Sequence, residues 1–262
     1  MTTRFACALC FVAVTTFAFA LLPGSAVRSF VLHAAQGAPQ AVASSSTSVS
    51  ASAARSRSTL ERFLADTESF SSLVSYQAVR RLSVVARGGK MKAWLTARTS
   101  LDPQQGFTYQ VLDESGSGML RSRVLHAALE AESEAKRRQK GAHGSLSVAN
   151  YDFEVEDWTS DGLLRVAIHP KRKDSLLMEG SIFLTAEAAD LVRMEGLLVK
   201  RPSFWTRKVE IVRDYGRIHG VRVPITMGST ADILFAGQST FTMDYEYESI
   251  NDVPVTMSQS ER

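Results

Sequence analysis

The sequence predicts an α+β fold built on a curved antiparallel sheet, an unclosed half-barrel of about nine to eleven strands. From Asn150 onward, short runs of alternating apolar and polar residues are separated by tight-turn residues. Before that point, two segments carry apolar residues at helical spacing. Almost every predicted strand has one apolar face, so we expect helices to cover the concave apolar face of the sheet.

Residues 1–26 have the features of a secretory signal peptide. Arg4 precedes an apolar run of 18 residues, 5–22, and small residues lead to a cleavage site expected after Ala26. We therefore expect the mature chain in the periplasm. The alternative is an uncleaved anchor in the inner membrane, because the run just reaches spanning length. Both cysteines, Cys7 and Cys10, lie in this run, so the cleaved chain would have no thiol.

The remaining chain divides by composition. Residues 27–58 are mostly small and polar with no periodicity, which predicts a disordered leader. One folded domain is expected over 59–255, followed by a disordered tail over 256–262. The formal net charge is only +3, so the composition does not predict nucleic acid as a partner.

The first predicted helix starts with Ser58 or Thr59 as its N-cap. Three strand-like runs follow it, and a second helix is predicted from about Met119 to Lys140, where no Gly or Pro interrupts the spacing. The apolar positions of the two helices are Leu60, Phe63, Leu64, Phe70 and Leu73 in the first, and Leu120, Val124, Ala127, Ala131 and Ala135 in the second.

The stretch "LLMEGSIFLTAEAADLVRMEGLL" contains Met-Glu-Gly twice, in two neighbouring predicted strands. Side chains alternate across a strand, so its even-numbered residues form one apolar face. A turn centred near Ala188 would place Gly180 opposite Gly196 and Ile182 opposite Met194. A glycine inside a strand usually marks a bend or the close approach of a ligand, and both interpretations remain open here.

The apolar face is predicted to be wider than its helices. Two helices about 10 Å across cannot fill the concave side of such a sheet, whose strands lie about 4.8 Å apart. Either the sheet curls strongly upon itself or space is left inside it. A curled sheet with a helical lid and spare apolar volume would form a cavity suited to an acyl chain, and we expect such a cavity. The residues predicted to line it are Leu176, Met178, Gly180, Ile182, Leu184, Val192, Met194, Gly196, Leu198, Val209, Ile211, Val223, Ile225, Met227, Phe241, Met243 and Tyr245.

The order of these elements resembles the LolA/LolB lipoprotein-carrier superfamily, whose fold the periplasmic sensor RseB shares. The resemblance covers about residues 59–250, including "LERFLADTESFSSLVSYQAV" and "RPSFWTRKVEIVRDYGRIHGVRVPITM". It implies a helical lid over a hydrophobic cavity, and it implies that the lining residues bind lipid or lipoprotein acyl chains. It also implies a transient membrane or membrane-protein partner. Carriage across the envelope is the first hypothesis, and an envelope sensor of the same fold is the alternative.

Phe204 and Trp205, beside Pro202, have two interpretations. They are either core residues at a strand end or an exposed anchor at the cavity mouth. The scattered basic residues, such as Lys171 and Arg201, are interpreted as solvated charge, with contact to anionic headgroups as the alternative.

No catalytic residue, metal site or cofactor is predicted. Gly116-Ser117-Gly118 before a helix lacks the further residues of a phosphate-binding loop. The histidines show no metal-ligand spacing, and no G-x-S-x-G motif is present. Glu179 and Glu195 fall on the solvated face. The chain is therefore interpreted as non-enzymatic, with a hydrolase as a remote alternative.

Overall fold

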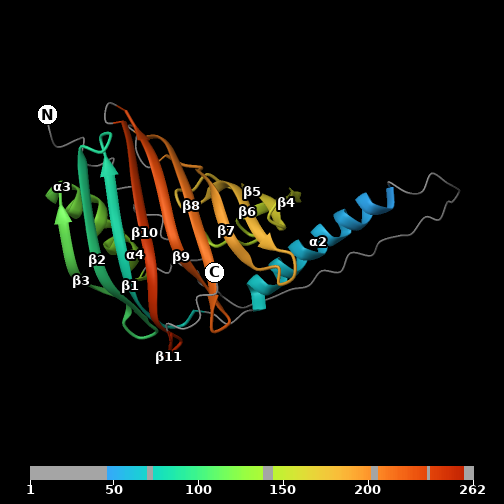
Figure 1. Ribbon diagram of the computed structural model, residues 1–262, viewed down its shortest axis with the longest axis horizontal. Coiled ribbons are helices and arrows are strands. Elements are labelled where there is room, and N and C mark those ends of the chain that lie inside the picture. The colour runs from blue at the N-terminus through green and yellow to red at the C-terminus, as the bar shows by residue number, and fades with distance from the viewer. Residues whose placement is uncertain (1–45, 70–72, 138–143, 202–205, 235–236, 257–262) are drawn as a thin grey trace, which may run out of the picture.

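A computed structural model describes residues 46–69, 73–137, 144–201, 206–234 and 237–256. Most of them form one antiparallel sheet in the order β3-β2-β1-β10-β9-β8-β7-β6-β5-β4, with the short β11 paired to β10. The sheet curves but does not close, because β3 and β4 stand at opposite ends of this order (Figure 1). The prediction of an unclosed antiparallel half-barrel with few helices is confirmed.

Ten long strands and one short strand make up the sheet. Their turns carry residues with positive φ, such as Ala189 (φ 52°) and His219 (φ 49°), close to where the turns were predicted. The strands are β1 (Tyr76–Ala86), β2 (Met91–Asp102), β3 (Gly106–Gly116), β4 (Tyr151–Trp158), β5 (Leu163–Pro170), β6 (Met178–Thr185), β7 (Leu191–Leu198), β8 (Thr206–Ile218), β9 (Val221–Ile233), β10 (Gly237–Ile250) and β11 (Val253–Pro254).

Helix α2 (Ser46–Ser69) begins earlier than the N-cap predicted at Ser58 or Thr59. Residues 46–58, which the composition assigns to the leader, form the first half of this helix. Ser56 explains part of the difference: its hydroxyl bonds the carbonyl of Ser52 at 3.0 Å and accepts a hydrogen bond from the Trp158 indole at 2.8 Å. Tertiary contact thus outweighs the weak helix propensity of a Ser-rich segment.

The second predicted helix is present but is not uniform. It consists of α3 (Gly118–Leu120), the π-helical segment η1 (Arg121–His126) and α4 (Ala127–Arg137) in direct succession. These three pack on β1, β2 and β3, whereas α2 contacts β4, β5 and β6 at the other end of the sheet (Figure 1).

Two rows of cross-strand neighbours run across nine strands, from β4 to β2. Partners in register point to the same side of a sheet, so the rows define what we call the apolar face. The methionine row is Val155, Val166, Ile182, Met194, Arg213, Met227, Met243, Leu82 and Leu95. The glycine row is Phe153, Ile168, Gly180, Gly196, Ile211, Ser229, Phe241, Val84 and Ala93.

The predicted register of the two Met-Glu-Gly strands is confirmed. Gly180 lies opposite Gly196, and Ile182 lies opposite Met194. A Cβ added at Gly180 would collide with the carbonyl oxygen of Glu195 and with Cα of Gly196. The obstacle is the backbone of the neighbouring strand, so this glycine pair allows the two strands to approach closely.

Three predicted inward positions are wrong or changed, and each lies where the alternation breaks. Leu176 precedes β6 and is only partly buried. A bulge pairs Leu184 with Leu191, so Leu191 is buried in place of Val192. A second bulge, where Asp214 pairs Thr226 but Tyr215 pairs Pro224, leaves Ile225 41% exposed. A bulge adds one residue to one strand and so shifts the faces of those beyond it.

Candidate functional site

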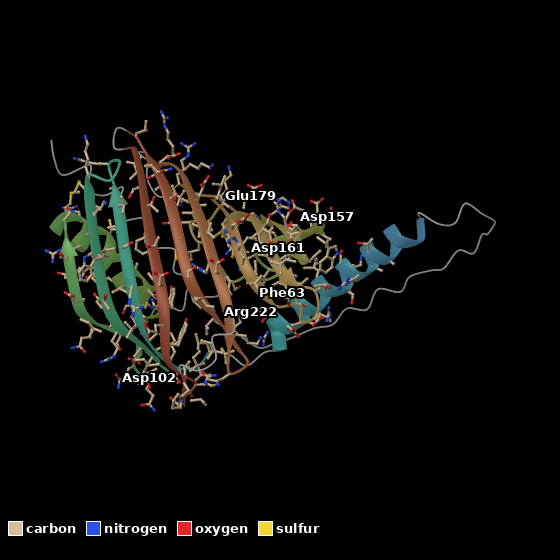
Figure 2. All side chains as sticks on the ribbon, in the orientation of Figure 1. Phe63, Asp102, Asp157, Asp161, Glu179 and Arg222 are labelled. Atoms are coloured by element: carbon tan, nitrogen blue, oxygen red, sulfur yellow. The ribbon has the colours of Figure 1, made fainter. Side chains whose placement is uncertain are left out.

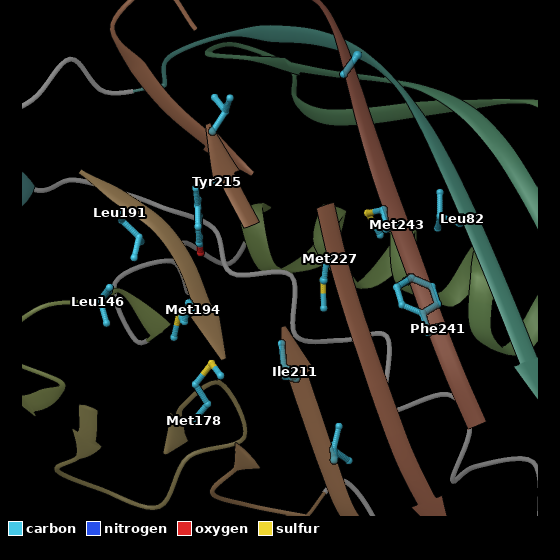
Figure 3. Packing of buried hydrophobic residues seen from close by; sticks show 14 of the residues in the cluster. Leu82, Leu146, Met178, Leu191, Met194, Ile211, Tyr215, Met227, Phe241 and Met243 are labelled. Carbon is cyan, nitrogen blue, oxygen red and sulfur yellow. The ribbon is translucent and has the colours of Figure 1, made fainter. Parts of the chain in front are cut away.

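Most of the predicted lining residues lie in the main hydrophobic core. Figure 3 shows Met178, Met194, Ile211, Met227 and Met243 on neighbouring strands of this core. Gly180, Gly196, Leu198 and Tyr245 are partly buried. The fully buried members are Met178, Ile182, Leu184, Met194, Val209, Ile211, Val223, Met227, Phe241 and Met243. These side chains are shielded from water in this conformation.

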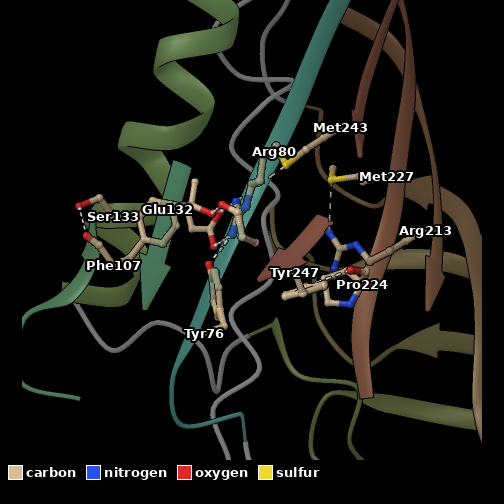
Figure 4. A network of polar contacts seen from close by, with 12 residues as sticks. Tyr76, Arg80, Phe107, Glu132, Ser133, Arg213, Pro224, Met227, Met243 and Tyr247 are labelled. Carbon is tan, nitrogen blue, oxygen red and sulfur yellow. Dashed lines mark hydrogen bonds and ion pairs between the residues drawn. The ribbon is translucent and has the colours of Figure 1, made fainter. Parts of the chain in front are cut away.

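A charged cluster interrupts the apolar face where α4 meets β1. Arg80 of β1 is 2% exposed and forms an ion pair with Glu132 of α4, with Nη1–Oε2 at 2.5 Å and Nη2–Oε1 at 3.1 Å. Arg80 Nη2 also donates to the hydroxyl of Tyr76 (Figure 4). The guanidinium lies 4.6 Å from the ring centre of Tyr245. One arginine thus joins the sheet to the helix through charge and aromatic contacts.

The surroundings of this cluster favour charged arginine and neutral tyrosine. Burial lowers the pKa of Arg80, but the charge of Glu132 and the neighbouring tyrosines outweigh burial, and the net pKa is well above its ordinary value. Burial raises the pKa of Tyr245, against the opposing effect of Arg80. The tyrosine hydroxyls therefore remain hydrogen-bond donors at neutral pH.

A second buried arginine lies in the middle of the methionine row. Arg213 of β8 is 6% exposed, and its guanidinium lies 3.5 Å from the hydroxyl of Tyr215 and 3.6 Å from Sδ of Met227 (Figure 4). Burial lowers its pKa, but Tyr215 and Tyr245 act against burial and the net pKa is raised. Burying a charge costs several kcal/mol unless it is compensated, so two such residues on an apolar face indicate a specific role.

The sequence interpretation missed both arginines, although the alternation contains them. Arg80 shares its parity with Ala78 and Leu82, and Arg213 shares its parity with Ile211 and Tyr215. A charged residue in step with buried ones was the available signal. Glu132 gave a weaker signal, because it follows Leu125 and Leu129 at helical spacing.

A groove of about 640 Å³ lies between α2 and the edge strand β4. Leu60, Phe153 and Val155 give it an apolar floor, and charged and hydroxyl side chains surround them. Its lining residues are Ser52, Ala53, Ser56, Arg57, Leu60, Phe153, Glu154, Val155, Glu156 and Asp157. This volume lies in the range of small-molecule sites.

The C-terminal part of α2 is held by polar contacts to the sheet. Arg62 donates to the carbonyl of Glu187 at 2.7 Å. The guanidinium of Arg222 lies 5.3 Å from the ring centre of Phe63. Both residues are labelled in Figure 2. Arg222 in turn bonds Asp190 at 2.8 Å. These contacts fix one end of the helix, while its N-terminal end extends beyond the sheet (Figure 1).

The Gly-Ser-Gly turn and the histidines, none of which was predicted to form a site, make contacts within the fold. The backbone amide of Ser117 donates to the carbonyl of Lys92 at 2.9 Å, so the Gly-Ser-Gly turn is bound to β2. His126 contacts Glu114 at 2.6 Å, and His169 lies 3.7 Å from both Glu154 and Glu179. Within the described ranges, no three His, Cys, Asp or Glu side chains form a group suited to a metal ion.

Several predictions concern other parts of the chain. Phe204 and Trp205, the signal peptide and both cysteines lie outside the described residues. Among the helices that the structure does describe, none combines the length and hydropathy needed to cross a membrane.

Comparison with known proteins gives no further assignment. No protein-family model matches the chain, and no curated protein matches it either.

Proposed function

We propose that the chain binds lipid, or the acyl chains of a lipoprotein, on the apolar face and carries them across the cell envelope. The observation that carries this proposal is the pair of cross-strand rows, which extend over nine strands of a sheet that does not close. Each buried methylene contributes about 0.8 kcal/mol, so one long chain would gain on the order of ten kcal/mol before costs. Carriage in the periplasm follows from the signal peptide that the sequence predicts.

The two helical segments act as covers in this proposal. Glu132 of α4 pairs with Arg80 of β1. Leu60 of α2 lines the same groove as Phe153 and Val155 of β4. Their backbone contacts fall mainly on β1–β3 and β4–β6, toward opposite ends of the sheet. Movement of either cover would open the apolar face from one end.

A second candidate is a sensor or interaction protein of the same fold. The groove beside β4 favours it, because this edge strand pairs with β5 alone among the described strands. An unpaired strand edge can add a strand from a partner. Pull-down from envelope extracts distinguishes the two: lipoproteins are expected for a carrier, and a membrane regulator is expected for a sensor.

Ligand binding is tested by native mass spectrometry of protein purified from the envelope, together with titration of a fluorescent fatty acid. We expect bound lipid in the mass spectrum and saturable uptake of the probe. Met194→Lys, on the apolar face of β7, should weaken probe binding at least about tenfold, because a charge there is costly to bury. Met194→Gln is a milder version for the case that the lysine variant does not fold.

Leu197→Lys is the matched control, because Leu197 lies on the same strand and is 39% exposed. This variant should bind the probe as the unmodified protein does. Empty protein in the mass spectrum and no probe uptake would refute the carrier proposal.

A further inference from the structure

Within the part of the chain that the structure describes, one buried polar atom of Arg80 and one of Ser229, both on the apolar face, have no hydrogen-bond partner. They are Nε of Arg80 and Oγ of Ser229. Ser229, which is 3% exposed, lies in the glycine row between Ile211 and Phe241. Unsatisfied buried groups are rare in proteins, so these two atoms are available to hydrogen-bond a polar ligand atom.

The two buried arginines lie on either side of one methionine pair of this face. Arg80 on β1 lies 3.8 Å from Sδ of Met243 on β10, and Arg213 on β8 lies 3.6 Å from Sδ of Met227 on β9. Met243 and Met227 are direct cross-strand partners, so one methionine pair separates the two guanidinium groups (Figure 4).

Tyr245 adds a hydroxyl to this arrangement. It pairs with Arg80 across β1 and β10, and its ring lies against the guanidinium. Tyr245 packs against the core, and the residue as a whole is only partly buried.

We propose that Arg80, Arg213 and Tyr245 form an oxyanion site for the headgroup of a single-chain anionic amphiphile, whose tail lies along the methionine row. The inference rests on the proposed function and deepens it by naming the ligand class. Guanidinium groups pair with carboxylate and phosphate through charge-assisted hydrogen bonds, and these bonds are strengthened where water is excluded. The methionine side chains fit a flexible tail, because thioether chains adapt their shape.

The test compares four probes on the delipidated full chain by isothermal titration: hexadecanoate, hexadecyl phosphate, hexadecanol and inorganic phosphate. We expect both anionic amphiphiles to bind about ten- to a hundredfold more tightly than hexadecanol, as charged hydrogen bonds predict. Hexadecanoate and hexadecyl phosphate separate carboxylate from phosphate headgroups. Inorganic phosphate should bind weakly, because it has no tail.

Variants assign the preference to the site. Arg213→Met should lower the ratio of hexadecanoate affinity to hexadecanol affinity toward one. The milder variant Tyr245→Phe should lower the same ratio by less. Arg207→Met, an exposed position on the same strand β8, should leave the ratio unchanged.

Three outcomes overturn the inference. Equal binding of hexadecanol and hexadecanoate would reject the oxyanion site and leave lipid binding intact. Binding of inorganic phosphate as tight as that of the amphiphiles would indicate a site for the free ion. No binding of any amphiphile would reject the proposed function itself.

Discussion

At the scale of residues, the Arg80–Glu132 pair places two charges where little water reaches them, with side chains 2% and 10% exposed. Both side chains lie under the sheet–helix interface, where the charge of one is needed to offset that of the other. The neighbouring pair Arg81–Glu246 joins the same strand β1 to β10, but its side chains are 60% and 38% exposed. Both pairs start from neighbouring residues of β1, so a difference in their contribution to stability can be assigned to burial.

We expect Glu132→Gln to destabilise the protein by about 3–5 kcal/mol, because it leaves a buried guanidinium without its counter-charge. The double variant Arg80→Met with Glu132→Leu should recover most of this loss, since no charge then remains buried. The free energy of unfolding from urea titration measures both. Glu246→Gln is the control and should cost about 0–1 kcal/mol. Equal costs for Glu132→Gln and Glu246→Gln would contradict this account.

At the scale of elements, bulges and the glycine pair decide which side chains reach the apolar face. The bulges near Leu184 and near Tyr215 change the parity that the sequence alternation predicts. The Gly180–Gly196 pair instead preserves the register and permits close approach of β6 and β7. The close approach of the two strands at this place thus depends on the absence of two side chains.

Gly180→Ala should destabilise the protein by about 1–3 kcal/mol, because its Cβ would collide with rigid backbone of β7. Gly228→Ala on β9 is the matched control, since a Cβ there meets nothing within 4 Å. Its effect should be neutral or stabilising by up to about 1 kcal/mol, through the entropy of the unfolded chain. Chemical denaturation midpoints decide the point, and similar losses for both variants would count against a steric role.

At the scale of the whole molecule, Asp190 joins parts that are distant in sequence. It lies in the turn between β6 and β7 and accepts hydrogen bonds of 2.8 Å from Arg217 and from Arg222, at the facing ends of β8 and β9. The guanidinium of Arg222 also packs against the ring of Phe63 in α2. One carboxylate thus joins two hairpins and, through Arg222, the helix α2.

The acid stability of the protein should depend on this residue. Burial raises the pKa of Asp190, but hydrogen bonds from Arg217 and Arg222 outweigh burial, so the folded-state pKa is lowered. A lowered pKa contributes stability above the unfolded value of about 3.9, and this contribution is lost as the pH falls through the folded value. Asp190→Asn should therefore reduce the stability of the protein at pH 7. On acidification, the variant should lose less stability than the unmodified protein does.

Thermal unfolding between pH 7 and pH 3 measures the effect, with Glu187→Gln in the same turn as an exposed control. If the unfolding temperatures of Asp190→Asn and of the unmodified protein fall in parallel with pH, the protonation of Asp190 does not contribute to the acid sensitivity.

The sequence predicted much of the fold because its signals are local. Alternation located the strands, and the Met-Glu-Gly repeat gave the register of β6 and β7. It could not locate Val192 or Ile225, because a bulge is set by the partner strand. Nor did it show that Leu176 lies before the start of β6. It also could not foresee that Ser56 would bond Trp158, about a hundred residues away, and so extend α2 into the Ser-rich leader.

By itself the sequence determined that an apolar face exists, since alternating residues must segregate to opposite sides of a sheet. Only the tertiary structure decided that Arg80, Glu132 and Arg213 meet on that face, because the pairing of β1, β10, β9 and β8 brings together residues from both halves of the chain. Strand periodicity acts between neighbours in sequence, whereas a charge acts on whatever the fold places beside it.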